Sequence, residues 1–208
     1  DAQESRGLGD VYKRQVLIVG GLFDAEDCYG AWELYKAIRK QSPQTDLEII
    51  MGPWHHGAWN GKGQSNLGNI DFGSQTVLYY RNNIEYPFLQ YHLNNIGSPT
   101  PASQKATVFF SGKNEWKQFH AWPPTDTRPL SFYLGENGTL NMCPPEKKES
   151  HSEYISDPDK PVPYTDKTTY TRPKEYMTGD QRFSERRPDV LSFKTEPLKE
   201  SITLGLSL

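Results

Sequence analysis

The chain has little that would tie it to a membrane, a nucleic acid or a disulfide framework. It has only two cysteines, Cys28 and Cys143, and that number does not define a redox compartment. No apolar run approaches the roughly 18 residues of a membrane span. The net charge is −3, with Lys and Arg scattered, so composition argues against a nucleic-acid partner. His92, His120 and His151 are isolated and lack metal-ligand spacing, so we predict neither metal nor cofactor.

The strongest pattern in the chain lies in residues 16–57. The apolar run at 16–19, closed by two glycines, predicts a buried parallel strand. A second apolar run at 47–51 predicts the next strand. The residues between them have apolar side chains at helical spacing, namely Ala31, Leu34, Tyr35 and Ile38. Strand, helix and strand together form a βαβ unit, and such sheets bind substrates beyond the carboxyl ends of their strands.

Asp24 and His56 both fall at such strand ends. They are 32 residues apart in sequence, and the acid precedes the His, which is the order found in α/β-hydrolase triads. Two structural alternatives stay open at this point. Asp24 is also suited to cap the following helix, with an acid three residues later. His56, in a Gly-Pro-Trp loop, is also compatible with a purely structural role. A carboxylate–imidazole distance within about 3.2 Å would favour the triad.

The segments GGLFDAEDCYG and MGPWHHG resemble the family of cocaine esterase and α-amino-acid ester hydrolase. This family also includes glutaryl-7-aminocephalosporanic-acid acylases and Xaa-Pro dipeptidyl-peptidases. The similarity continues through FFSGKNEWKQFHAWPP, SDPDKPVPY and YMTGDQRFSERRPDVLSFKTEPL. It implies that Asp24 is the triad acid and His56 the triad base, while His55 is not catalytic. It also implies that Glu26 and Asp27 bind the substrate's α-ammonium, against the alternative of a solvated first helical turn.

The same resemblance implies a serine hydrolase of esters or amides that works through an acyl-enzyme. Its substrates would carry a free α-amine: amino-acid esters, β-lactam acyl side chains or X-Pro dipeptides. Family members are often exported and oligomeric, which favours a periplasmic or secreted homo-oligomer. The sequence contains no G-x-S-x-G motif, because Ser65, Ser74 and Ser111 stand in other contexts. In the family the nucleophile and an oxyanion-binding Tyr lie upstream of the Asp, so we expect this chain alone to be inactive.

Both ends of the chain carry a further signal. Residues 10–15, DVYKRQ, are encoded by GATGTGTATAAGAGACAG, the mosaic-end adapter of tagmented sequencing libraries. The last three residues, Leu206, Ser207 and Leu208, fit its reverse complement. We therefore expect residues 1–15 to be an adapter artefact and exclude them from fold reasoning.

The region after the His loop changes character near residue 100. A Gly- and Asn-rich loop at 57–73 and a helix at 74–95, interrupted by Pro87, complete the first part. The segment 96–105 is rich in Pro, Gly and small polar residues, which predicts a domain boundary. Short β-branched and aromatic runs separated by turns follow it, at 106–110, 116–121, 130–134, 190–195 and 201–204.

The expected fold is thus α/β plus all-β. Residues 16–98 would be the C-terminal part of an α/β-hydrolase domain, and residues 104–208 a truncated jelly-roll β-sandwich. The alternative function is a non-catalytic β-sandwich that binds carbohydrate or protein. Exposed aromatic side chains would serve that role by stacking on sugar rings, with Trp116, Trp122, Phe132 and Tyr133 as candidates. Such residues more often belong to a core.

Overall fold

A computed structural model describes residues 15–63, 65–146 and 149–204. The chain divides into two compact units. Unit 1 contains Asp1–Thr125 and Arg172–Thr178, and unit 2 contains Asp126–Thr171 and Gly179–Leu208. The segments predicted to be adapter-derived lie outside the described residues, except for Gln15, the first residue of a strand.

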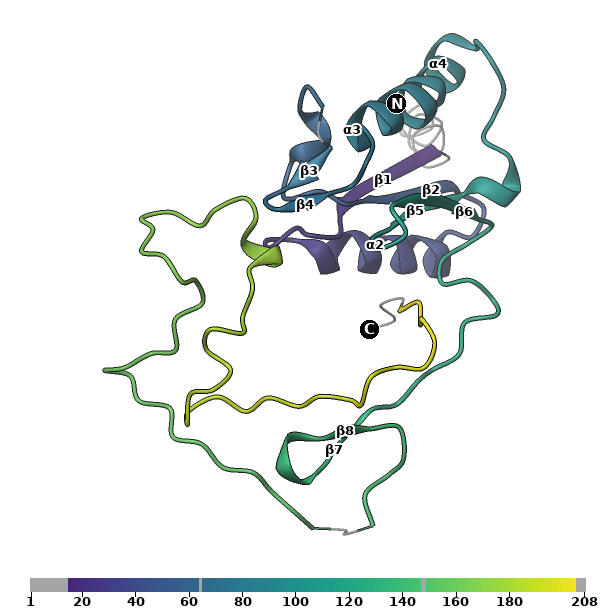
Figure 1. The fold of residues 1–208 in the computed structure, drawn as a ribbon. Coiled ribbons are helices and arrows are strands. Elements are labelled where there is room, and N and C mark those ends of the chain that lie inside the picture. The colour runs from purple at the N-terminus through teal and green to yellow at the C-terminus, as the bar shows by residue number, and fades with distance from the viewer. Residues whose placement is uncertain (1–14, 64, 147–148, 205–208) are drawn as a thin grey trace, which may run out of the picture. The chain divides into compact units, whose positions relative to one another are not determined.

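Unit 1 is built on a four-stranded mixed sheet (Figure 1). Its strands lie in the order β1 (Gln15–Gly21), β2 (Asp46–Gly52), β5 (Ala106–Phe110) and β6 (Glu115–Phe119). The first three strands are parallel, and β6 returns antiparallel to β5. The βαβ unit predicted from the sequence is therefore present.

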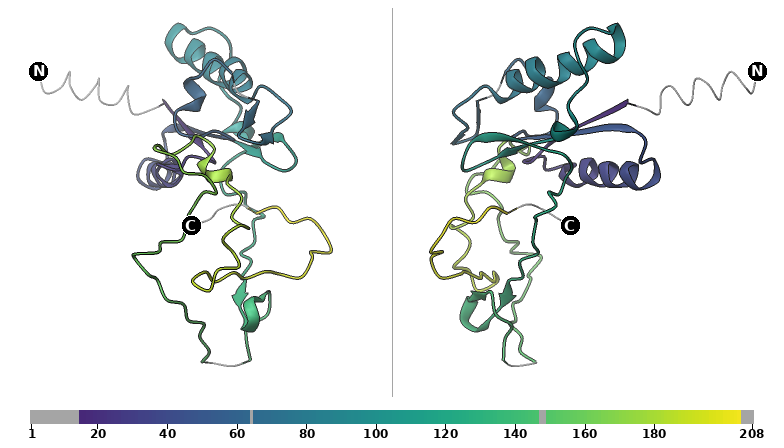
Figure 2. Two further views of the ribbon diagram at one scale, coloured as in Figure 1. Left: turned by 60° about the vertical axis from the view of Figure 1, so that its left-hand side comes forward. Right: turned by 90° about the vertical axis from the view of Figure 1, so that its right-hand side faces the viewer.

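Helices cover both faces of this sheet (Figures 1 and 2). Helix α2 (Cys28–Gln41) packs on one face, against alternate strand residues such as Ile18, Ile49 and Met51. The opposite face carries Ile50, which packs with α3 (Thr76–Tyr80). Full burial of an Ile or Met side chain stabilises a fold by about 1.5–3 kcal/mol, so a strand buried on both faces is a strong local determinant.

The buried stripe of α2 agrees with the predicted one at Tyr35, and at Ala31 and Ile38, which are partly buried against the core, but differs at Leu34. Trp32 and Tyr35 are its buried residues, whereas Leu34 is 52% exposed. The ring of Trp32 stacks on Trp122 at a centroid distance of 5.4 Å. The large aromatic side chain of Trp32, which the spacing did not predict, is thus part of the buried face, whereas Leu34 is not.

The second helical region is interrupted, as Pro87 predicts. α3 continues into a π-helical turn, Arg81–Glu85, and then into α4 (Tyr86–Asn94), whose first turn contains Pro87. A proline lacks the backbone N–H and crowds the preceding turn, so the wider π turn accommodates it. The helix predicted from residue 74 begins at Thr76, with Gln75 at its N-cap position.

The Gly- and Asn-rich loop after the His is more structured than expected. It contains a 3-10 turn, η1 (Ala58–Asn60), and a small hairpin of β3 (Asn66–Leu67) and β4 (Ile70–Asp71). Leu67 and Phe72 are buried and pack with Phe109 of β5. Two apolar side chains thus anchor a segment whose composition alone suggests a solvated loop.

The sheet of unit 1 includes two strands that follow the predicted boundary at residues 96–105. β5 pairs with β2 through Ile49–Ala106 to Met51–Val108, and β6 pairs with β5. Both strands therefore belong to the sheet of unit 1 and not to a separate sandwich. Just before β5, after the 3-10 turn η3 (Ala102–Gln104), Lys105 donates to Asp46 and Glu48 of β2.

The expected jelly roll is not formed by the described residues of unit 2. They contain a short pair, β7 (Tyr133–Leu134) and β8 (Leu140–Asn141), joined by a 3-10 turn, η4 (Glu136–Gly138), and a bridge between Thr139 and Lys194. The predicted strands at 190–195 and 201–204 are otherwise irregular. A sandwich needs a second sheet to bury its apolar face, yet Leu134 is 62% exposed.

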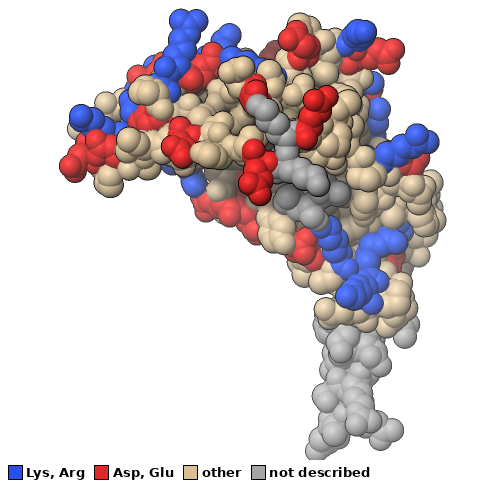
Figure 3. All heavy atoms as spheres, turned by 90° about the horizontal axis from the view of Figure 1, so that it is seen from below, with Lys and Arg blue, Asp and Glu red and all other residues tan. Residues whose placement is uncertain are grey.

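Acidic and basic side chains are intermingled over the face drawn in Figure 3, in keeping with the net charge of −3. Among the described residues, no helix combines the length and apolar character needed to cross a membrane. Cys143 is exposed and Cys28 is partly buried, and both are free thiols.

Candidate active site

The loops after β1 and β2 are fastened to each other by backbone hydrogen bonds. The N–H of Leu22 donates to the carbonyl of Gly52 at 2.8 Å, and the N–H of Phe23 donates to the carbonyl of Trp54 at 3.1 Å. The parallel pairing of the two strands thus continues beyond their regular ends. The residues that follow, Asp24 and His56, are therefore brought together by the main chain.

Trp54 anchors the His loop in the core. Its side chain is fully buried, and its indole Nε1 donates to Thr76 Oγ1 of α3 at 3.0 Å. A Cβ atom added to Gly52 would lie 2.5 Å from the indole ring, so a side chain at that position would displace it. The Gly-Pro-Trp sequence before the His pair therefore has a packing function: it fixes the path of the loop.

Asp24 is the buried acid of the site. It is 3% exposed, and its Oδ1 accepts hydrogen bonds from the backbone N–H groups of Glu26 at 2.8 Å and Asp27 at 3.0 Å. Burial opposes ionisation of Asp24. These two backbone donors, together with His56, outweigh it and hold the pKa of the carboxyl below its usual value. Asp24 is therefore an ionised acceptor of fixed orientation.

His56 accompanies this carboxylate. Its Nδ1 lies 2.9 Å from Asp24 Oδ2, and the imidazole is about half exposed. The hydrogen bond and the charge of Asp24 raise the pKa of His56 against the opposing effect of desolvation, and the charges of Glu26 and Asp27 add smaller increases. With Nδ1 donating to Asp24, Nε2 carries the lone pair and is able to accept a proton.

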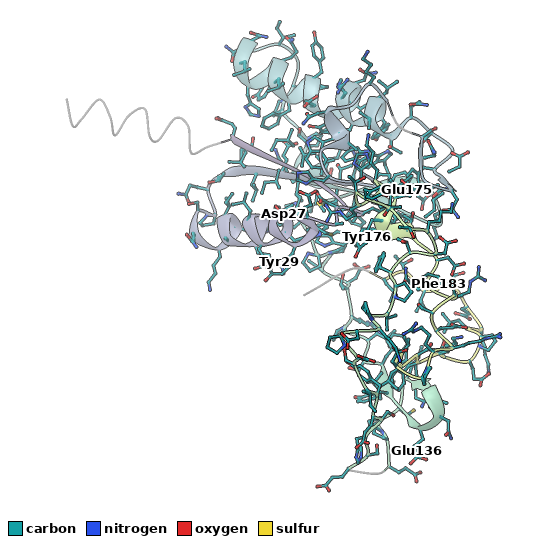
Figure 4. All side chains as sticks on the ribbon, turned by 90° about the vertical axis from the view of Figure 1, so that its left-hand side faces the viewer. Asp27, Tyr29, Glu136, Glu175, Tyr176 and Phe183 are labelled. Carbon is teal, nitrogen blue, oxygen red and sulfur yellow. The ribbon has the colours of Figure 1, made fainter. Side chains whose placement is uncertain are left out.

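The helix cap is Asp27, and not Asp24. Oδ1 of Asp27 accepts from the backbone N–H of Gly30 at 2.8 Å, at the first turn of α2 (Figure 4). Asp24 therefore does not occupy the N-cap position of α2, which was the structural alternative for it. Its second oxygen, Oδ2, bonds His56. The bond to Gly30 also gives Asp27 a structural task beside the predicted substrate-binding one.

Glu26 lies at the rim of the site, between two partners. Its Oε2 is 3.8 Å from His56 Nε2, and its Oε1 accepts from the guanidinium of Arg172 at 2.5 Å. Arg172 belongs to the segment Arg172–Thr178, which contains the 3-10 turn η5 (Tyr176–Thr178) and groups with unit 1. Sequence reasoning missed Arg172, because the partners are 146 residues apart and no local pattern links them.

The other candidates do not join this site. His55 Nδ1 contacts the backbone carbonyl of His56 and not Asp24. Trp116 packs with Trp54, and Trp122 packs with Trp32, so these two aromatics contribute to the core. Within the described ranges, no group of three or more His, Cys, Asp or Glu is arranged to hold a metal ion.

An ionised carboxylate bonded to an imidazole, at the carboxyl ends of neighbouring parallel strands, has the geometry of the acid and base of a hydrolase triad. Comparison with known proteins relates the chain to hydrolases. Residues 94–205, more than half of the chain, match the family model of the X-Pro dipeptidyl-peptidase C-terminal non-catalytic domain. The chain belongs to this family, as its resemblance predicted.

Two solved structures are similar to the chain over 88% of its length. One is an aminopeptidase from a marine sediment archaeon, Thaumarchaeota archaeon, with a TM-score of 0.79 and 35% identity. The other is an α-amino acid ester hydrolase, with a TM-score of 0.73 and 34% identity. The cocaine esterase of Rhodococcus sp. (strain MB1 Bresler) is 27% identical over 165 residues, 76% of the chain. The chain spans 28% to 31% of the length of these relatives, which are hydrolases.

Proposed function

We propose that this chain supplies the acid and the base of a serine hydrolase that cleaves esters or amides through an acyl-enzyme. The observation that carries the proposal is the 2.9 Å contact between Asp24 Oδ2 and His56 Nδ1, with the imidazole accessible from solvent. The nucleophilic Ser and the oxyanion donors would come from a segment preceding residue 16 in the intact enzyme, as the family resemblance implies. The 208 residues by themselves would be inactive.

In this mechanism Nε2 of His56 accepts the proton of the Ser hydroxyl while Oγ attacks the substrate's carbonyl carbon. The proton then passes to the leaving alcohol or amine as the carbonyl–heteroatom bond breaks, which leaves the acyl group on Ser. A water molecule, activated by the same nitrogen, hydrolyses the acyl-enzyme and regenerates both residues. Asp24 stays ionised throughout, holds the tautomer, and stabilises the imidazolium that forms in each half-reaction.

The acyl group would carry a free α-amine, as in amino-acid esters, β-lactam acyl side chains or X-Pro dipeptides. Two features support this preference. Glu26 and Asp27 are both exposed beside His56, and their charges, with that of Asp24, create a negative local field. A substrate ammonium reduces the repulsion among clustered carboxylates, whereas a neutral acyl group does not. Glu26 is the stronger candidate ligand, because Asp27 also caps α2.

The domain assignment follows from the same proposal. Residues 16–98 would complete an α/β-hydrolase domain whose remaining strands continue the sheet beyond β1. Residues 104–208 would be the incomplete jelly-roll region, with β5 and β6 as its link to the hydrolase sheet. Periplasmic or extracellular location and homo-oligomer formation remain inferences from the family alone.

The test begins with the source DNA upstream of residue 16. We expect an open reading frame that encodes a strand–turn–helix with G-x-S-x-G ahead of Asp24. The extended protein should hydrolyse phenylalanine p-nitrophenyl ester and react with a fluorophosphonate probe at that Ser. His56→Ala should lower kcat/KM by about 10³-fold or more, because the loss of one triad member removes most of what the whole triad contributes. His55→Ala is the matched control and should leave kcat/KM nearly unchanged.

A frame that lacks any upstream nucleophile would overturn the hydrolase proposal. Turnover that survives in His56→Ala would overturn it as well. In the first case the binding-module alternative becomes the next hypothesis, and glycan-array binding of the 208-residue chain would test it.

A further inference from the structure

The two oxygens of Glu26 face different partners, and this division is central to the inference. Oε1 accepts from Arg172, and Oε2 lies 3.8 Å from Nε2 of His56, the nitrogen that has to receive a proton in the proposed mechanism. That spacing is longer than a hydrogen bond. Glu26 therefore stands beside the reactive nitrogen without occupying it.

Arg172 is held in place by its own segment. Its guanidinium lies 5.7 Å from the ring centroid of Tyr176, within cation–π range. Backbone bonds from Tyr176 to Pro173 and from Thr178 to Glu175 close the turn. A Cβ atom on Gly68, between β3 and β4, would lie 2.7 Å from Cβ of Glu175, so this turn packs closely on the hairpin of unit 1. The segment is labelled at Glu175 and Tyr176 in Figure 4.

Without Arg172, the charged side chains that act on His56 would all be carboxylates. Asp24, Glu26 and Asp27 all act on the imidazole, from the loop that precedes α2. Among the described residues, Arg172, in the segment that contains η5, is the cation that contacts this group of carboxylates, through Glu26. An unpaired Glu26 side chain is attracted to the imidazolium, and a direct Glu26–His56 ion pair would occupy Nε2.

We propose that Arg172 is a positioning residue that sets the specificity of the site. It binds one oxygen of Glu26, keeps that carboxylate off Nε2 of His56, and leaves the second oxygen available to a cationic group of the substrate's acyl moiety. The substrate part of this inference rests on the proposed function. The positioning of Glu26 by Arg172 is independent of it.

The first experiment follows the His56 ring by NMR during a pH titration of the 208-residue chain. In Arg172→Gln the pKa of His56 should rise, because Glu26 then moves toward Nε2. Arg172→Lys should restore much of the native value, since it keeps the charge. In a Glu26→Gln background, Arg172→Gln should no longer change the titration. Lys174→Gln removes a neighbouring charge from the same segment and is the matched control.

The second experiment measures ligand binding to the same chain. Phenylalanine methyl ester is compared with methyl 3-phenylpropanoate, which lacks the ammonium group. Arg172→Gln should lower the preference for the ammonium ligand roughly two- to fivefold, the range expected when one exposed ion pair is lost. A preference that rises instead would mean that Arg172 competes with the ammonium, and would overturn the specificity role.

The titration separates this inference from the proposed function. An effect of Arg172→Gln that persists in the Glu26→Gln background, or that Lys174→Gln reproduces, would show a remote charge effect and refute positioning. An unchanged titration would refute it too. If the titration behaves as expected while the extended protein shows no Ser-dependent turnover, positioning stands and the hydrolase proposal fails.

Discussion

Gly21 and Trp54 approach each other so closely that a side chain between them is excluded. A Cβ atom on Gly21 would lie 2.3 Å from the carbonyl oxygen of Trp54, the same oxygen that accepts from the N–H of Phe23. This contact draws the end of β1 against the His loop. It sets the separation of the two loops that carry Asp24 and His56.

Gly21→Ala should therefore damage the acid–base pair from outside it. We expect a loss of about 1–3 kcal/mol in the free energy of unfolding, as for other overpacked positions. The pKa of His56 should fall toward its ordinary value as Asp24 moves away. Urea denaturation and NMR titration measure the two effects. Gly61→Ala is the control, since its Cβ would meet Ala58 O at the milder distance of 3.0 Å. Equal effects in both variants would contradict this explanation.

The Asp24–His56 pair should stabilise the fold within a defined pH window. The folded-state pKa of Asp24 is lowered below the ordinary 3.8, so its contribution is present above that value and is lost as pH falls through the lowered pKa. The folded-state pKa of His56 is raised above 6.5, so its contribution is complete below 6.5 and is lost as pH rises through the raised pKa.

His56→Gln should consequently destabilise the chain most between these two ordinary values. Urea denaturation at about pH 3, 5.5 and 8.5 samples the two limits and the window between them. His55→Gln, whose ring contacts a backbone carbonyl, should show no such maximum. A destabilisation by His56→Gln that is constant over the range would refute the linkage.

Thr76→Val should leave the buried indole N–H of Trp54 without its hydroxyl partner. The bond is 3.0 Å long and both residues are fully buried, so we expect a loss of about 1–3 kcal/mol in the free energy of unfolding. Adding Trp54→Phe removes the stranded donor. The double variant should then lose less than the sum of the two single variants. Strict additivity would mean that the bond contributes nothing.

Lys105→Met should destabilise the chain through Glu48. That carboxylate is 1% exposed, and Lys105 Nζ lies 3.0 Å from its Oε1. Burial opposes the charge on Lys105, but its bonds to Asp46 and Glu48 raise its pKa. Removing one partner of a buried pair costs about 3–5 kcal/mol. Glu48→Leu combined with Lys105→Met should recover much of this loss, as thermal and urea unfolding would show. Failure to recover would point to a backbone role for residue 105.

Asp27→Ala and Asp27→Asn together should show how much the helix cap at this position contributes to stability. Loss of the bond to Gly30 N should cost about 0.5–2 kcal/mol of stability, measured by urea denaturation. Asp27→Asn keeps a capping side chain and removes the charge, so it should be nearly as stable as the native chain. If the Asn variant is as unstable as the Ala variant, the negative charge matters more than the hydrogen bond.

The site could be predicted where it depends on local sequence order. Strand, acid, helix, strand and His recur in a fixed spatial relation, so the proximity of Asp24 and His56 followed from the βαβ pattern. The contact of Glu26 with Arg172 did not, because it joins residues whose closeness depends on the whole path of the chain.

The fold was predicted correctly for the first strands and less well after residue 96. Pro and Gly at 96–105 mark a real break in regular structure, but composition does not say which sheet the next strand joins. β5 joins β2, and Lys105 just before β5 contacts Asp46 and Glu48, which lie 59 and 57 residues away in the sequence. The jelly roll predicted for the later residues remains a prediction.

Arg172 lies inside the region matched by a family model described as non-catalytic, yet its guanidinium contacts the carboxylate beside His56. Residues of this region contact the preceding part of the chain elsewhere too, through β5, Lys105 and Trp116, but among its described residues Arg172 is the one that contacts Glu26. A chimera that exchanges residues 94–205 between two relatives would also exchange this side chain. We expect such hybrids to inherit part of their acyl-group preference from the donor of the C-terminal module.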